Sequence, residues 1–238
     1  MARSGSRRPR ADATRNRAAL VTAARRVFER NGFVAARITD IADEAGLAHG
    51  SFYSHFRTKE DALAAVLTEV AEEMLHPGPE LPDARDPAAA IEAANLAYLQ
   101  AYQRNAALML VLEQVASVDK DFLSLRLERS RAFLERNAGF ISRLQLEGIA
   151  DPDLDPELAA LALSVMVSRS AYAVLAVGLC EADLPALAAT VTRLWLNALR
   201  IPPSPHALRS PRSPDAPRSP RSPHVLPSPP SPPTGGPT

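Results

Sequence analysis

The sequence predicts an all-α protein with two helical domains, and three observations support this prediction. Alanine and leucine are abundant, while aromatic residues make up only 5% of the 238 residues, a composition that favours helices. Apolar residues recur at the three- and four-residue spacing of a helix face, and no stretch alternates with the period of two that is typical of strands. Glycine, proline and asparagine interrupt these patterns where helices are expected to end.

The N-terminal part is expected to form three helices after a flexible arm. Residues 1–13 are rich in arginine and lack apolar periodicity, which predicts a disordered basic arm. A first helix is expected over 14–31, because Gly32 follows where a C-terminal cap belongs. Two short helices are expected over 38–45 and 49–55.

A fourth helix is expected to begin after Thr58, with Asp61 completing a capping box. The following segment, 76–87, contains four prolines and a glycine, which predicts a loop. The remaining helices are expected near 88–104, 106–116, 121–147, 156–177 and 183–200. We therefore expect a first helical domain over 14–62 and a second helical domain over 63–201.

The C-terminal segment 202–238 differs from the rest of the chain. It holds 14 of the 22 prolines and seven Ser-Pro dipeptides. Such a segment cannot bury enough apolar surface to offset its ordering entropy, so a disordered Ser-Pro-rich tail is expected.

The net charge of zero conceals an asymmetry along the chain. Residues 1–60 contain 12 Lys/Arg against 6 Asp/Glu, whereas residues 61–201 contain 11 against 20. A basic front followed by an acidic middle suggests that only the front meets a polyanion such as DNA. A basic arm without a partner is the alternative interpretation.

Composition and motifs argue against secreted, membrane-spanning and enzymatic proteins. The single cysteine, Cys180, excludes an internal disulfide and a cysteine-rich metal site, and fits a reducing cytoplasm. The N-terminus does not resemble a signal peptide, and the absence of a run of 18 apolar residues predicts that no segment spans a membrane. None of the five histidines lies in 88–200, and phosphate-loop, nucleophile-elbow and zinc-protease motifs are absent from the sequence. We expect neither enzymatic activity nor a cofactor.

The segment 32–63 carries the functional signal. Its two short helices flank the tight turn Gly46-Leu47-Ala48, and Ile41, Ala42 and Ala45 add a small apolar surface where they cross. Small residues at this crossing let the helices approach closely, as a helix-turn-helix requires, and the second helix would enter a major groove.

This segment resembles the DNA-binding domain of the TetR family of bacterial repressors over about residues 14–65. The matching residues are Phe28 and Gly32-Phe33, Asp40-Ile41-Ala42, Ala45-Gly46-Leu47, Gly50-Ser51-Phe52-Tyr53, His55-Phe56 and Lys59-Glu60-Asp61-Ala62-Leu63. The sequence departs from the family pattern at Arg37 and Ala48, where the family usually has a capping Thr or Ser.

The resemblance implies the roles of residues around the second short helix. Tyr53 stands at the family's phosphate-contacting tyrosine, and Lys59 lies in the first turn of the next helix, which attracts phosphate. His49 and Ser51 are the candidates for reading base edges. Each of these residues could instead have a structural role without touching DNA. Tyr53 could belong to the core, Gly50 and His55 could lie at the surface, and Lys59 could point into solvent. The expected DNA-binding residues are Arg37, Thr39, His49, Gly50, Ser51, Tyr53, His55 and Lys59.

In the second domain, the resemblance implies a ligand pocket and a two-helix dimer surface. The expected pocket residues are Tyr98, Tyr102, Met109, Phe133, Phe140, Met166 and Tyr172, which favour a mostly apolar ligand but could equally form the core. The expected dimer residues are Ala160, Ser164, Ser168, Ala171, Leu187, Thr190, Val191, Leu194 and Ala198, which could instead pack within one subunit.

These features together predict a ligand-responsive DNA-binding regulator. The expected partners are double-stranded operator DNA, a second copy of the chain in a homodimer, and a small-molecule inducer that releases a repressor from a palindromic operator. The alternative is an architectural DNA-binding protein that responds to no ligand. An interaction protein that uses its Ser-Pro tail is a further alternative.

Overall fold

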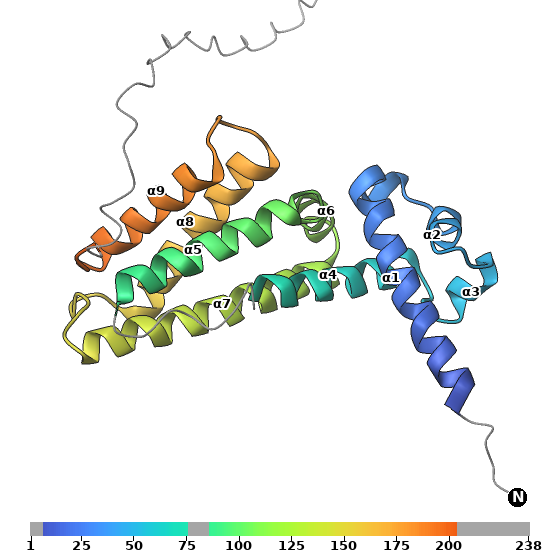
Figure 1. The fold of residues 1–238 in the computed structure, drawn as a ribbon, viewed down its shortest axis with the longest axis horizontal. Helices are drawn as coiled ribbons and strands as arrows, with labels where there is room; N and C mark the ends of the chain where they lie inside the picture. The colour runs from blue at the N-terminus through green and yellow to red at the C-terminus, as the bar shows by residue number, and fades with distance from the viewer. Residues whose placement is uncertain (1–6, 76–85, 204–238) are drawn as a thin grey trace, which may run out of the picture.

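A computed structural model describes residues 7–75 and 86–203 of the chain (Figure 1). Throughout this described part the chain is helical and contains no strand, which confirms the predicted all-α class. The expected tail beyond residue 203 and most of the expected loop, 76–85, lie outside the described residues.

Three helices build the smaller lobe. They are α1 (Arg7–Ala35), α2 (Ile38–Glu44) and α3 (His49–Tyr53). Helix α1 begins seven residues before its expected start, so residues 7–13 belong to this helix rather than to a flexible arm. Arginine and alanine are good helix formers, and extending an existing helix costs far less than nucleating one. The non-helical backbone of Gly32, with φ +70°, ends the regular part of α1 as expected.

The longer helices build the larger lobe. They are α4 (Lys59–Leu75), α5 (Pro87–Arg104), α6 (Ala106–Ala116), α7 (Lys120–Leu146), α8 (Pro156–Ala171) and α9 (Leu184–Ala198). A π-helical turn, η1 (Tyr172–Ala176), continues α8 and was not expected from the sequence. The ends of the other helices agree with the expected ones to within a few residues.

Aspartates and prolines fix where these helices start. Asp86, Asp155 and Asp183 each accept a hydrogen bond from a backbone N–H of the first turn, and proline occupies the first or second position of the helix that follows. The predicted capping box at α4 is also present. Thr58 Oγ1 accepts from the Asp61 N–H, and the Asp61 carboxylate accepts from the Thr58 N–H, both at 3.1 Å.

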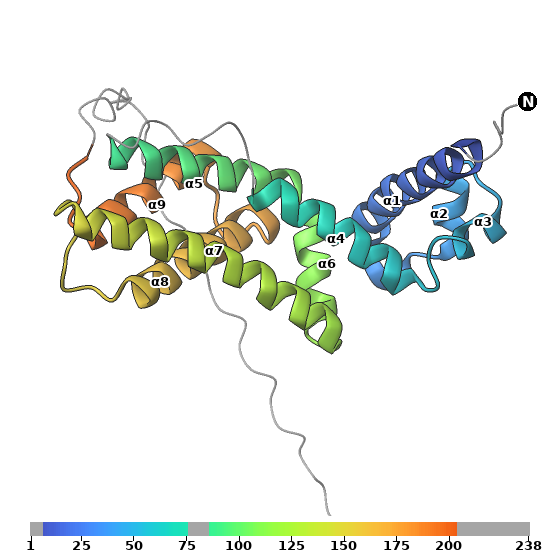
Figure 2. The same cartoon turned by 90° about the horizontal axis from the view of Figure 1, so that it is seen from below.

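The two lobes meet along α1, α4 and α6. Helix α1 crosses the N-terminal half of α4, and α4 then runs into the larger lobe, where α5, α7, α8 and α9 lie alongside one another (Figure 1). Viewed from below, the short α6 crosses steeply between the lobes (Figure 2). Both α4 and α6 pack against α1, so the position of α1 depends on the larger lobe.

One helical segment of the described residues is long and apolar enough to cross a membrane. Residues Pro156–Ala176, which comprise α8 and η1, meet this description by length and composition alone, although the sequence contains no run of 18 apolar residues. A single such helix is weak evidence, because a core helix of a globular protein meets the same description. Only 22% of its most apolar 18-residue stretch is buried, so α8 presents apolar surface on the outside of the protomer.

Candidate functional site

Helix α3 is the exposed tip of the smaller lobe. Its Phe52 is fully buried against the lobe, and Phe56, just past the helix, is also buried. On the other side His49 and Gly50 are exposed, and Tyr53 keeps 53% of its surface accessible. The rings of His49 and Tyr53 meet edge to face at 5.4 Å. This arrangement presents a polar, aromatic face that a DNA groove could accept.

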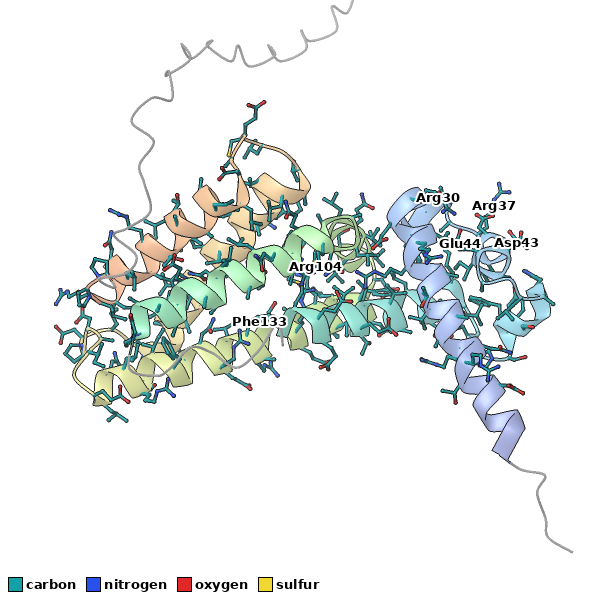
Figure 3. The ribbon with its side chains drawn as sticks, viewed as in Figure 1. Arg30, Arg37, Asp43, Glu44, Arg104 and Phe133 are labelled. Atoms are coloured by element: carbon teal, nitrogen blue, oxygen red, sulfur yellow. The ribbon has the colours of Figure 1, made fainter. Side chains whose placement is uncertain are left out.

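The other residues expected to contact DNA differ in how exposed they are. Ser51 and His55 are half-buried, and Thr39 is exposed on α2. Arg37 is exposed at the start of α2, and its side chain makes no capping hydrogen bond, as its chemistry predicts. The Asp40 carboxylate instead accepts from the Arg37 backbone N–H at 3.2 Å. The guanidinium of Arg37 therefore extends outward from α2 (Figure 3).

Charged pairs hold α2 against α1. The two carboxylate oxygens of Glu44 lie 3.4 Å from Arg26 Nη1 and 3.3 Å from Arg30 Nη1. Figure 3 shows Arg30 and Glu44 at the end of the lobe where these helices meet. Below the charges Ile41 and Ala42 are fully buried, and Ala45 and Leu47 pack against the same core, which confirms the predicted helix crossing.

Lys59 is engaged within the protein. Its Nζ donates to the carbonyl of Phe33 at 2.8 Å and to that of Ala36 at 3.0 Å, and it lies 4.4 Å from the centre of the Phe33 ring. An ammonium has three donors, so one remains for a phosphate. Lys59 thus also fastens the end of α1 to the start of α4, a role that the sequence did not suggest.

A hydrogen-bonded junction joins the lobes. The Arg25 guanidinium on α1 donates to Glu73 Oε1 on α4 at 2.7 Å and to Asn105 Oδ1, between α5 and α6, at 2.6 Å. Asn105 is 1% exposed, and its Nδ2 donates to Glu73 Oε2 at 3.1 Å and to the carbonyl of Ala101 at 2.8 Å. We call Arg25, Glu73 and Asn105 the junction triad. It links three helices of both lobes through side chains far apart in the sequence.

The electrostatics of the junction triad follow from these bonds. Burial raises the pKa of Glu73, but hydrogen bonds from Arg25 and Asn105 outweigh it and leave this pKa below its ordinary value. Burial opposes the charge of Arg25 as well, yet its bonds to Glu73 and Glu29 raise the pKa of the guanidinium. Both groups are therefore charged at neutral pH.

Five of the expected pocket residues gather inside the larger lobe. The Tyr98 ring lies 6.1 Å from that of Tyr102 and 5.5 Å from that of Phe133, which projects between α5 and α7 (Figure 3). Met109 accepts a hydrogen bond from Arg129 of α7, and Tyr172 is close enough to affect the pKa of Tyr102. Phe140 packs under Arg143, and Met166 packs against the apolar core; neither has a described ring contact with this group.

The expected dimer residues fall into two sets. Ala160, Ala171, Leu187 and Val191 are buried within the protomer, and Ser164 accepts a hydrogen bond from Asn137 of α7 at 2.9 Å. Thr190, Leu194 and Ala198 are exposed, whereas Ser168 is half-buried. The exposed apolar surface of α8 is formed instead by Leu158, Leu161 and Val165, which are 66%, 43% and 48% exposed. The small-residue stripe thus faces the inside of the subunit, because small side chains let α8 approach its own neighbours.

Two half-buried arginines, Arg25 and Arg129, were not expected as functional residues, although the periodicity carries a signal for them. Arg25 lies four residues after Val21, which is 1% exposed, and three before Phe28, also 1% exposed. Arg129 lies seven residues after the buried Phe122 and four before Phe133. Both arginines thus occupy positions on otherwise apolar helix faces, where a charge needs a specific reason.

Comparisons with known proteins agree with this geometry. Residues 20–66 match the family model described as bacterial regulatory proteins of the tetR family. The chain is 29% identical over 175 residues to the HTH-type transcriptional regulator TtgR of Pseudomonas putida, covering 68% of this chain and 80% of the relative. It is 29% identical over 144 residues to the HTH-type transcriptional repressor KstR2 of Mycolicibacterium smegmatis, covering 58% and 69%.

A solved structure shows the same fold across both lobes. It is that of a putative transcriptional regulator from Saccharomonospora viridis in complex with choline, with a TM-score of 0.64 at 18% identity, covering 76% of this chain and 95% of the other. The helix-turn-helix, the arrangement of the larger lobe and these matches together place the chain in the TetR family of bacterial transcriptional regulators.

Proposed function

We propose that this chain is a repressor that binds a palindromic operator as a homodimer and leaves it when a small, mostly apolar molecule enters the larger lobe. The name of the Mycolicibacterium relative as a repressor supports the direction of control. The complex of the Saccharomonospora protein with choline supports a small molecule as the signal, because that protein has the same fold.

The junction triad is the observation that carries this proposal. A ligand among α5, α6 and α7 would displace the break between α5 and α6, where Asn105 lies. Asn105 is bonded to Arg25 of α1 and to Glu73 of α4, so its displacement would move α1 of the smaller lobe together with α4, which runs between the two lobes. A hydrogen-bonded network with two alternative arrangements is a physical route for such coupling.

The dimer that we propose uses the exposed surface of α8 and α9. Leu161 and Val165 on α8 and Leu194 on α9 are apolar and between 43% and 48% exposed, and the two helices pack against each other. An exposed apolar surface of this kind is typical of a protein interface. A two-fold pairing would place two copies of α3 in successive major grooves, about 34–36 Å apart.

The experiment that tests this proposal is selection of binding sites from random duplex DNA, followed by footprinting upstream of the chain's own and neighbouring genes. We expect a palindrome with half-sites about one helical turn apart, protected in both half-sites, and increased transcription when the regulator gene is deleted. Binding without sequence preference, together with unchanged transcription on deletion, would contradict repression and favour an architectural role.

A further inference from the structure

Guanidinium groups outnumber carboxylates where α5, α6, α7 and α8 meet. Arg126 and Arg129 come from α7, Arg169 comes from α8, and Glu113 from α6 is their shared carboxylate. Glu113 Oε2 lies 3.0 Å from Arg126 Nη1 and 3.9 Å from Arg169 Nη1. This excess of positive charge is unexpected inside a domain that is acidic overall, with 20 Asp/Glu against 11 Lys/Arg over residues 61–201.

Arg129 is the member of this group that lacks a carboxylate partner. Within the described part of the chain its hydrogen bond goes from Nη1 to the thioether Sδ of Met109 at 3.2 Å, and no carboxylate oxygen lies within 4 Å. A thioether is a weak, neutral acceptor, so it compensates little of the cost of withdrawing a guanidinium from water. That withdrawal lowers the pKa of Arg129, although Tyr98, Tyr102 and Glu113 act in the opposite direction.

Two tyrosine hydroxyls, those of Tyr98 and Tyr102, are close enough to Arg129 for its charge to affect their pKa. Neither Tyr98 nor Tyr102 has a hydrogen bond from its hydroxyl within the described residues, although Tyr102 is only 4% exposed. Burial raises the pKa of Tyr98 to about 12, so its hydroxyl keeps its proton at neutral pH. Both hydroxyl oxygens keep some contact with solvent. In the described part of the chain, the fully buried side-chain nitrogen or oxygen that lacks a hydrogen-bond partner is Trp195 Nε1, so neither tyrosine oxygen is fully buried.

These groups have the composition of an anion-recognition site. A guanidinium offers several donors in a planar fork that matches a carboxylate, and neutral tyrosine hydroxyls add two further donors. Phe133, edge to face on Tyr98, provides an apolar wall beside them. The rest of the ligand can be apolar, as the proposed function requires, while one end carries the negative charge.

We propose that the inducer is a small organic acid whose carboxylate is bound by Arg129, Tyr98 and Tyr102 and whose apolar part packs against Phe133. This inference rests on the proposed function, because it names the chemical class of the molecule to which the larger lobe responds. It also gives a reason for Arg129 on an apolar face of α7: the ligand supplies the missing counter-charge. Met109 and Glu113 lie on α6, so binding at this place would bear on the helix that packs against α1.

The test compares acids with neutral amides of the same shape, namely octanoate with octanamide and benzoate with benzamide. Binding to the full-length protein is measured by calorimetry, and operator release is measured separately by fluorescence anisotropy. We expect at least one acid to bind about tenfold or more tightly than its amide, because a hydrogen bond to a charged group is worth more than a neutral one. Failure of both acids to bind, or equal affinity for acid and amide, overturns the inference.

Single substitutions test whether Arg129 and Tyr102 cause the preference for the acid over its amide. Arg129→Met should lower acid affinity about tenfold or more and abolish the preference for the acid over its amide. Arg131→Met, at an exposed position on the same helix, should behave as wild type. Tyr102→Phe removes only the hydroxyl and should lower acid affinity several-fold in a protein whose helical circular dichroism is unchanged. An undiminished preference for the acid in both Arg129→Met and Tyr102→Phe contradicts the assignment.

Two outcomes distinguish the anion site from ligand-responsive repression. If an acid binds through Arg129 and the operator stays bound, the anion site stands and ligand-responsive repression is wrong. If an amide releases the operator while no acid binds, ligand response stands and the anion site is wrong.

Discussion

Tyr53 lies on the exposed face of α3 between two aromatic rings. Its ring is fixed on one side by Phe52, at 5.6 Å, and on the other by His49, while 53% of its surface is exposed. The hydroxyl has no hydrogen bond within the described residues, so the protomer itself gives it no structural task. A rigid aromatic with a free donor suits contact with a phosphate.

We therefore predict that Tyr53→Phe lowers operator affinity several-fold and to a similar extent on different DNA sequences. The free energy of unfolding should stay within about 0.5 kcal/mol of wild type, since an exposed hydroxyl without a partner contributes little. Fluorescence anisotropy with two duplexes and urea denaturation measure the two quantities. Unchanged affinity would remove the Tyr53 hydroxyl from the DNA interface.

Lys59 has two roles, and its substitution should therefore have two effects. Lys59→Ala removes two hydrogen bonds to the carbonyls of Phe33 and Ala36, so we predict a loss of about 1–3 kcal/mol in the free energy of unfolding. If its third donor reaches phosphate, the dependence of operator binding on salt should also fall by about one unit of slope. Arg57→Ala, at the exposed neighbouring position, is the control for stability. Wild-type stability in Lys59→Ala would contradict the fastening role.

At the scale of elements, helix positions were largely predictable because their ends are signalled locally. Gly32 and Gly46, the capping box at Thr58, and Asp-Pro at the starts of α5 and α8 each act within one turn of the backbone. The long-range contacts were not predictable in this way. The junction triad joins residues 48 and 80 positions apart, and nothing local indicates which charged side chain meets which helix.

The orientation of α8 was likewise not predictable from local sequence signals. The spacing of Ala160, Ser164, Ser168 and Ala171 indicates a face of small residues, but spacing alone does not say which neighbour covers that face. In the structure α7 covers part of it, and the larger residues Leu161 and Val165 are left outside. Periodicity thus identified the two helices of the proposed dimer surface, while packing determined which of their faces is free.

The junction triad gives a prediction about pH. The pKa of Glu73 is lowered in the folded protein, so its ion pair with Arg25 stabilises the fold above the ordinary carboxylate pKa of 4.5. This stabilisation is lost as the pH falls through the lowered pKa and Glu73 takes up a proton. Glu73→Gln should therefore be less stable than wild type at pH 7, by about 1 kcal/mol or less because the pair is partly exposed.

The difference in unfolding free energy between Glu73→Gln and wild type should shrink below the pKa of 4.5, and urea denaturation at several pH values measures it. Glu69→Gln, on the same helix and exposed, provides the comparison. A difference that does not depend on pH would show that the charge of Glu73 is not what stabilises the junction.

At the scale of the whole molecule, the exposed apolar residues of α8 and α9 predict how the dimer can be disrupted. Leu161→Glu combined with Leu194→Glu should shift the protein to a monomer, because charges would have to be buried in the interface. Sedimentation velocity measures the shift, and affinity for a full palindrome should fall while affinity for a single half-site is retained. Leu127→Glu, at a leucine of α7 that is 54% exposed, should remain dimeric. A dimeric double variant would place the interface elsewhere.

In the function that we propose, the two lobes respond to different partners, and thermodynamics requires the two responses to be equal. If a ligand in the larger lobe weakens operator binding by displacing the junction triad, then the operator must weaken ligand binding by the same factor. We predict a coupling of about 1–3 kcal/mol, which is about 5- to 150-fold in affinity. Calorimetric titration of a ligand that releases the operator, with and without operator present, measures it directly. Asn105→Ala should reduce the coupling while both individual affinities persist, because it removes the contact between the α5–α6 break and both α1 and α4. Equal ligand affinities in the two titrations of the wild-type protein would leave a DNA-binding protein that does not sense the ligand.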